Sequence, residues 1–162
     1  MTTLLVAVHD EPEDAVHESA VSVRLPEAPA RSVTVMELSC WEKTLSVVAV
    51  HPDGTQAPIE YTFTYDSGSS QNVAVPIAFD GDTLYLDLFG TGFDKASGAS
   101  GTVVTVGTAT ASVTFSGFPP QGFAGEDQIV AQLPASLAGA GQVTVTVTVD
   151  GVAANPVTLT FQ

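Results

Sequence analysis

The sequence predicts an all-β protein that folds as a β-sandwich. Apolar and polar residues alternate with a period of two along most of the chain, which is the pattern of strands with one buried face. Turn-forming residues separate these runs at the spacing typical of a sandwich. No segment longer than two helical turns shows the 3.6-residue period of an amphipathic helix.

The clearest strand is residues 142–149, in which four valines alternate with three threonines. Asp150-Gly151 follows directly, and such pairs favour two-residue hairpin turns because both positions need positive φ. A second clear strand, 82–89, directs Leu84, Leu86 and Leu88 to one face. The other strands expected in this half are 73–79, 102–107, 111–116, 128–133 and the alternation of Val157, Leu159 and Phe161. This set of short strands predicts an immunoglobulin-like sandwich.

The first half of the chain also alternates. Asp53-Gly54 is another hairpin signal, and residues 66–72 are polar and flexible. This polar stretch indicates either a boundary between two subdomains or a long hairpin loop within one larger sandwich. The domain prediction is therefore an N-terminal β-rich subdomain at 1–70 and an immunoglobulin-like β-sandwich at 71–162. The strands expected in this half are 4–8, 20–25, 32–38, 45–50 and 59–65.

The chain is strongly acidic. Eighteen Asp and Glu residues face only Arg24, Arg31, Lys43 and Lys95, so the formal net charge is −14. Such a field repels the phosphates of nucleic acids and anionic lipid headgroups, and it attracts divalent cations. No apolar stretch reaches the roughly 18 residues that a membrane helix needs. We therefore expect neither nucleic-acid binding nor membrane insertion.

Two further observations bear on the cellular compartment. Cys40 is the only cysteine, so an intrachain disulfide is excluded. The first residues lack the basic and apolar regions of a signal peptide. Either a signal was removed before this chain begins, or the protein stays where it is made.

Several consecutive blocks from about residue 45 to the C-terminus resemble one family. They lie at 83–93, 104–107, 113–117, 122–130, 133–139 and 145–155. In this order they resemble the uncharacterised C-terminal domain of large secreted proteins of Acidobacteria (Solibacter-type), and more distantly the IPT/TIG immunoglobulin-like domains. The resemblance implies a β-sandwich on an exported or cell-surface protein, with no established activity and no catalytic residues. Residues 1–44 lie outside it.

No pattern of catalytic residues is evident. The sequence contains no G-x-S-x-G elbow, phosphate-binding loop, C-x-x-C pair or H-E-x-x-H motif. Cys40 lacks a paired base that would activate it as a nucleophile. A glycosidase needs two opposed carboxylates in a cleft, which a sequence with eighteen acids does not exclude. The prediction is a protein that is not an enzyme, with no catalytic, cofactor-binding or metal-binding residues.

Two groups of residues are weak candidates for metal binding. Asp80-Gly81-Asp82, with Asp66 or Asp94, offers oxygen ligands to calcium, which takes about six to eight of them. The full calcium-loop spacing is missing, so a solvated turn is the simpler interpretation. The second candidate, for a transition metal, is a group of His, Asp and Glu residues near the N-terminus. Their side chains would have to come together across a loop to bind the ion. This group comprises His9, Asp10, Glu11, Glu13, Asp14, His17 and Glu18.

Aromatic residues suggest a carbohydrate site. Tyr61, Phe63 and Tyr65 alternate with threonines and would occupy one face of a single strand. Such a row can stack on sugar rings, but it more often packs in a core, which is the interpretation we favour. Trp41 has the same two interpretations and is also expected inside.

These observations together predict a non-catalytic structural or adhesive module, extracellular or at the cell surface. Its partners would be other protein modules or further copies of itself. A self-assembling fibre is one form of this hypothesis, because a terminal strand such as 4–8 or 157–161 can complete the sheet of a neighbour. The alternative is a carbohydrate-binding module of a secreted protein, with a polysaccharide as ligand.

Overall fold

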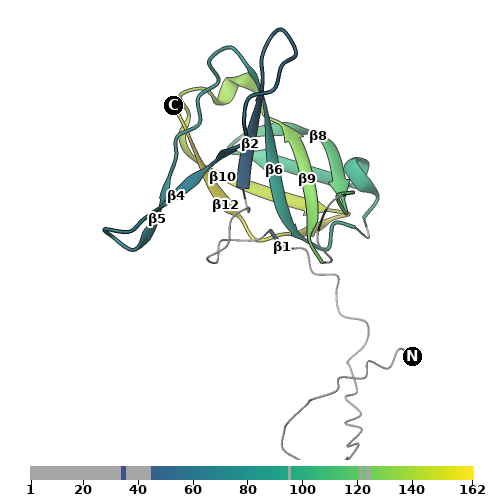
Figure 1. The fold of residues 1–162 in the computed structure, drawn as a ribbon. Coiled ribbons are helices and arrows are strands. Elements are labelled where there is room, and N and C mark those ends of the chain that lie inside the picture. Colours follow the sequence, from purple (N-terminus) through teal and green to yellow (C-terminus); the bar gives the residue numbers. More distant parts are fainter. Residues whose placement is uncertain (1–33, 36–44, 95, 121, 123–124) are drawn as a thin grey trace, which may run out of the picture. The chain divides into compact units, whose positions relative to one another are not determined.

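A computed structural model describes residues 34–35, 45–94, 96–120, 122 and 125–162 (Figure 1). The chain divides into two units, Met1–Ala30 and Arg31–Gln162, and all described residues belong to the second. Their elements are β1 (Thr34–Val35), β2 (Leu45–Val50), β3 (Glu60–Tyr61), β4 (Phe63–Asp66), β5 (Gln71–Ala74), β6 (Thr83–Thr91), η1 (Gly98–Gly101), β7 (Thr102–Val106), β8 (Ala109–Gly117), β9 (Asp127–Gln132), η2 (Ala135–Leu137), β10 (Gly141–Val149), β11 (Val152–Ala153) and β12 (Val157–Phe161). The all-β prediction is confirmed.

The strands form two layers of a sandwich. The first layer has the order β3-β2-β6-β9-β8, with β1 also paired to β6. The second contains β7 and β10, with β11 and β12 paired to β10, and it lies behind the first in Figure 1. β8 joins the layers because it pairs with β7 near its start and with β9 further along. The register shifts between Val113 and Phe115, and such a bulge lets a strand bend from one sheet into the other.

The core lies between the two layers, and β6 and β10 provide its centre. Alternate residues of both strands are buried, as the sequence predicts. They are Leu84, Leu86, Leu88, Val145, Val147 and Val149. At the edge of the core, the rings of Phe79 and Phe161 stack with their centroids 6.1 Å apart. β12 contributes further to the core, because Val157 and Leu159 are also buried.

The predicted turn after β10 is confirmed. Asp150 and Gly151 have φ angles of 47° and 82°, so both occupy the left-handed region that a two-residue hairpin requires. Asp80 and Gly81 repeat this geometry before β6, with φ angles of 45° and 86°. At Asp53-Gly54 only the glycine has positive φ, so this turn is of a different type.

The described residues on both sides of the expected boundary at 70/71 form one sandwich. β2 lies before this boundary, yet it pairs with β6 along its whole length, from Leu45↔Leu88 to Val50↔Thr83. Leu45 and Val47 are buried in the common core. The polar stretch is the turn of the β4–β5 hairpin, as in the alternative interpretation, because Asp66 accepts hydrogen bonds from the backbone N–H groups that follow it. The strands expected at 4–8 and 20–25 lie outside the described residues.

Candidate interaction surface

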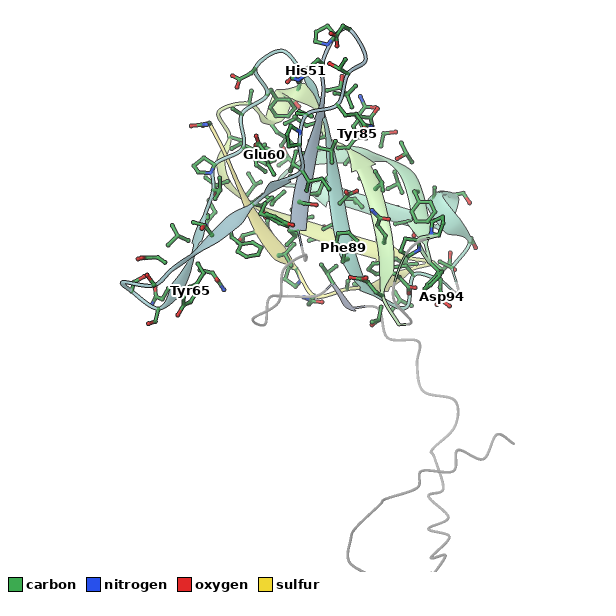
Figure 2. The ribbon with its side chains drawn as sticks, in the orientation of Figure 1. His51, Glu60, Tyr65, Tyr85, Phe89 and Asp94 are labelled. Carbon is green, nitrogen blue, oxygen red and sulfur yellow. The ribbon has the colours of Figure 1, made fainter. Side chains whose placement is uncertain are left out.

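The β4–β5 hairpin forms an arm, which we define as residues 63–74. β4 and β5 pair only with each other and extend away from the two layers (Figure 1). Every residue of the arm is exposed except Phe63, which is half-buried. Tyr65 is 62% exposed and lies on the arm in Figure 2. The arm therefore presents both of its faces to solvent.

Thr62 explains why the arm leaves the sandwich. Its buried hydroxyl and its backbone N–H both donate to the carbonyl of Leu45, each at 3.3 Å. The backbone N–H of Val75 donates to the Thr62 carbonyl at 2.9 Å, which closes the base of the arm. The chain bends at Thr62, so the expected strand 59–65 is divided into β3 and β4.

The prediction that the aromatic row 61–65 belongs to the core is wrong. Tyr61 is 40% exposed, Tyr65 is more exposed still, and Thr62 is buried in their place. Alternation shows that neighbouring residues point to opposite sides, but it does not show which side is covered. Which face of the strand is buried depends on packing against strands that are distant in sequence.

A second aromatic surface lies on the outer face of the first layer. The antiparallel register aligns one residue from each strand in a row, and residues directly opposite one another point to the same side of a sheet. The row contains Tyr61, Ser46, Asp87, Val130 and Phe115. On β6, Asp87 lies between Leu86 and Leu88, which point into the core. Adjacent residues of a strand point to opposite faces, so the row that contains Asp87 faces outward.

Two more rings flank Asp87 along β6. Tyr85 and Phe89 lie two residues before and after it, and thus on the same face. Figure 2 shows both on the side of the sheet turned toward the viewer. We define the aromatic face as Tyr61, Tyr85, Phe89 and Phe115 around Asp87. Of these rings, Tyr85, Phe89 and Phe115 are half-buried, and Tyr61 is exposed.

Asp87 lies at the centre of this face without a cationic neighbour in the part of the chain that the structure describes. Burial raises the pKa of its carboxyl group, and a side-chain hydrogen bond with Gln128 partly opposes that rise. None of the described residues is a lysine or an arginine. The residues directly opposite Asp87 on the adjacent strands are Ser46 and Val130, which are uncharged.

The candidate calcium ligands do not come together. Asp80 and Asp82 precede β6 and Asp94 follows it, so nine residues of extended strand, about 30 Å, separate them. Asp66 lies in the arm, where its carboxylate accepts the hydroxyl hydrogen of Ser69 at 2.7 Å. Among the described residues, no three His, Cys, Asp or Glu side chains form a group that could hold a metal ion.

The remaining candidates fall into two groups. The transition-metal candidates, namely His9, His17 and the acids between and beside them, lie outside the described residues, as do Cys40 and Trp41. Of the two terminal strands, 4–8 also lies outside. The other, β12, pairs with β10 of its own chain from Gly141↔Phe161 to Val145↔Val157.

The alternation of residues did not predict the aromatic face, although the sequence of β6 indicates its two residues Tyr85 and Phe89. Along 84–89 the chain reads Leu-Tyr-Leu-Asp-Leu-Phe, so large apolar side chains occupy both faces of the strand. A strand beside solvent normally alternates apolar with polar residues. The contributions of Tyr61 and Phe115 depend on strand order, which alternation does not provide.

Comparisons with known proteins support the fold and the broader resemblance. A family model described as IPT/TIG domain matches residues 76–162, which include β6 to β12. No curated protein and no solved structure matches the chain. The narrower acidobacterial family therefore stays a prediction. Among the described residues, no helix is long and apolar enough to cross a membrane.

Proposed function

We propose that this chain, which belongs to the IPT/TIG domain family, is a structural or adhesive module that binds other protein modules outside the cell or at its surface. Domains of this family are immunoglobulin-like, non-catalytic and often extracellular, and they mediate protein–protein interactions. The observation that carries the proposal is the aromatic face. It places four rings where a solvated sheet would carry polar side chains.

Aromatic side chains on an outer sheet face favour an interaction with another protein. Clustered apolar side chains on a surface mark binding sites, and aromatic residues are enriched at the centres of protein interfaces. The net charge of −14 supports an extracellular location only indirectly, because it keeps an isolated module soluble and separate. The location is supported more directly by the family, whose members are often extracellular.

Binding of the fluorescently labelled chain to intact cells of the organism that encodes it tests the proposal. One portion of the cells is treated with protease and another with periodate, which oxidises surface sugars. An adhesive protein-binding module is expected to lose binding after protease and to keep it after periodate. Binding that survives protease and disappears after periodate would contradict the proposal, and so would the absence of any binding to cells or to their secreted proteins.

Carbohydrate binding is the second candidate function. It is favoured by Tyr65 on the arm and by Tyr61 at its base, because exposed rings stack on sugar rings. In affinity gels that contain neutral polysaccharides, retardation of the chain that Tyr65→Ala abolishes would support this candidate. Unchanged mobility in every gel would exclude it for the polysaccharides used.

A self-assembling fibre is the narrowest form of the structural hypothesis. β12 is paired within its own chain, so strand exchange is proposed for residues 4–8 alone. Light scattering of the purified chain distinguishes the forms: a mass near 16.6 kDa contradicts the fibre, and large regular assemblies support it. Deleting residues 1–9 is then expected to leave a folded subunit that no longer polymerises.

A further inference from the structure

We propose that the aromatic face binds an arginine-containing segment of a partner protein, with the guanidinium group paired to Asp87 and stacked on Tyr85 or Phe89. This inference rests on the proposed protein-binding function and specifies the partner's chemistry and the place where it binds. The binding residues are Tyr61, Tyr85, Asp87, Phe89 and Phe115.

The carboxylate of Asp87 lies between two aromatic rings on the same strand. Tyr85 and Phe89 each lie about 7 Å from Asp87 along β6. Across the strands its neighbours are Ser46, which is 3% exposed, and Val130. An arginine side chain suits this arrangement, because its planar guanidinium group donates hydrogen bonds to a carboxylate and stacks on an aromatic ring.

The charge of the aromatic face favours a cationic partner. Asp87 is half-buried, and its side-chain partner is the uncharged amide of Gln128. A carboxylate withdrawn from water is stabilised best by a cation, which the described part of the chain does not supply. The net charge of −14 also attracts a basic partner over long range and repels a second copy of this chain.

The dimensions of the aromatic face match a short extended segment. The row from Tyr61 to Phe115 crosses five strands and spans about 20 Å, and Tyr85 to Phe89 spans about 13 Å. The accessible part of the face is a narrow strip, because Tyr61 is exposed while the other three rings are half-buried. A segment of five or six residues in extended form fits it. The occupant is therefore a peptide segment rather than the face of another domain.

A set of capped ten-residue peptides provides the probe, in which threonine alternates with arginine, lysine or citrulline. Citrulline retains the shape of arginine without its charge. Each peptide is titrated into the full chain by calorimetry at an ionic strength of about 0.15 M, which screens long-range attraction. The expected order of affinity is arginine above lysine above citrulline.

Pairs of matched variants, one on the aromatic face and one elsewhere, test where the peptide binds. Asp87→Asn and Asp80→Asn each remove one negative charge, but only Asp87 lies on the aromatic face, because Asp80 occupies the turn before β6. We expect the arginine peptide to bind about tenfold more weakly to the first variant and less than about twofold more weakly to the second. Phe89→Ser and the exposed control Phe118→Ser are expected to differ in the same way.

Equal effects of the two aspartate variants would overturn the inference. Peptide-induced NMR shifts confined to the arm or to the second layer would do the same. Both results leave the protein-binding function standing, since the cell assay tests it separately. Conversely, protease-resistant binding to cells contradicts that function whatever the peptide does. Circular dichroism of each variant confirms that a weaker affinity does not reflect unfolding.

Three other occupants are also distinguished. A dimer that Phe89→Ser dissociates would identify a second copy of the chain. Retardation by a neutral polysaccharide that Phe89→Ser abolishes would identify a glycan. Peptide binding that appears only after Arg24→Gln and Arg31→Gln would identify the chain's own N-terminal part. Each of these outcomes overturns the inference, because each places a different ligand on the aromatic face.

Discussion

The carboxylate of Asp127 accepts a hydrogen bond of 2.8 Å from the backbone N–H of Phe93, a residue 34 positions earlier. The same oxygen, Oδ2, accepts a second hydrogen bond from the backbone N–H of Asp94 at 3.1 Å. Asp127 is the first residue of β9 and is opposite Gly90 in the register. Its side chain thus supplies the acceptor for the chain as it leaves β6, where strand pairing ends.

Asp127→Ala is expected to lower the free energy of unfolding by about 2–3 kcal/mol. Asp127 is 4% exposed, so its removal leaves the buried N–H of Phe93 without an acceptor, and desolvation of such a group is costly. Urea unfolding measures the loss. Asp127→Asn, which keeps one acceptor oxygen, is expected to lose less. A change within about 0.5 kcal/mol for the alanine variant would show that the bond adds little to stability.

Gly101→Ala is expected to destabilise the fold by about 1–3 kcal/mol, because a side chain at this position meets the carboxylate of Asp150 and the Cβ of Ser97. The Asp150 carboxylate also accepts the backbone N–H of Ser97 at 3.1 Å, and displacing it weakens that bond. A double-mutant cycle in urea measures the coupling. In an Asp150→Gly background, the alanine is expected to cost less. Equal costs in both backgrounds would show that the clash is not with Asp150.

The pair of His51 and Asp82 predicts a pH-dependent contribution to stability. The two side chains are 2.9 Å apart, and the hydrogen bond with Asp82, assisted by its charge, raises the pKa of His51 above the usual 6.5. Because the pKa is raised on folding, the contribution is fully present below pH 6.5 and is lost as the pH rises through the folded-state pKa. NMR titration of the His51 ring measures this pKa directly. Asp82→Asn is expected to lower it, and an unchanged value would exclude the pair as the cause.

Asp87→Asn is expected to raise the free energy of unfolding at neutral pH. Burial raises the pKa of Asp87 in the folded state, so the unfolded chain releases this proton at lower pH than the folded one. The wild-type protein is therefore destabilised as the pH rises through the folded-state pKa, and the uncharged variant avoids this loss. We expect the variant to be more stable than the wild type at pH 7 and equally stable at pH 2.5 in urea unfolding. A variant that is less stable at pH 7 would show that the charged form is well compensated in the free protein.

The gain expected for Asp87→Asn also bears on the aromatic face. A residue that lowers the stability of the free protein and lies among rings that still reach the solvent is typical of a binding surface rather than of a structural one. Together with the peptide titrations, the variant separates the two roles. It is expected to gain stability while it loses affinity.

The local geometry of this protein follows from residues that are neighbours in the chain. The alternation of valine and threonine in 142–149 predicts β10 within one residue, and Asp150-Gly151 predicts the turn that follows. The leucines of β6 likewise predict its inward face. These features depend on neighbours in the chain, because the pleat of a strand and the φ angles of a turn are properties of consecutive residues.

Which surfaces those strands cover depends instead on contacts between strands that are distant in the sequence. Asp127 begins β9, and its carboxylate accepts a hydrogen bond from the backbone N–H of Phe93 in the loop that follows β6. Tyr61 was expected in the core, and it joins Asp87 and Phe115 on an outer face that exists because five strands pair in one particular order. Strand order arises from contacts between residues far apart in sequence, and a two-residue period is the same in every order.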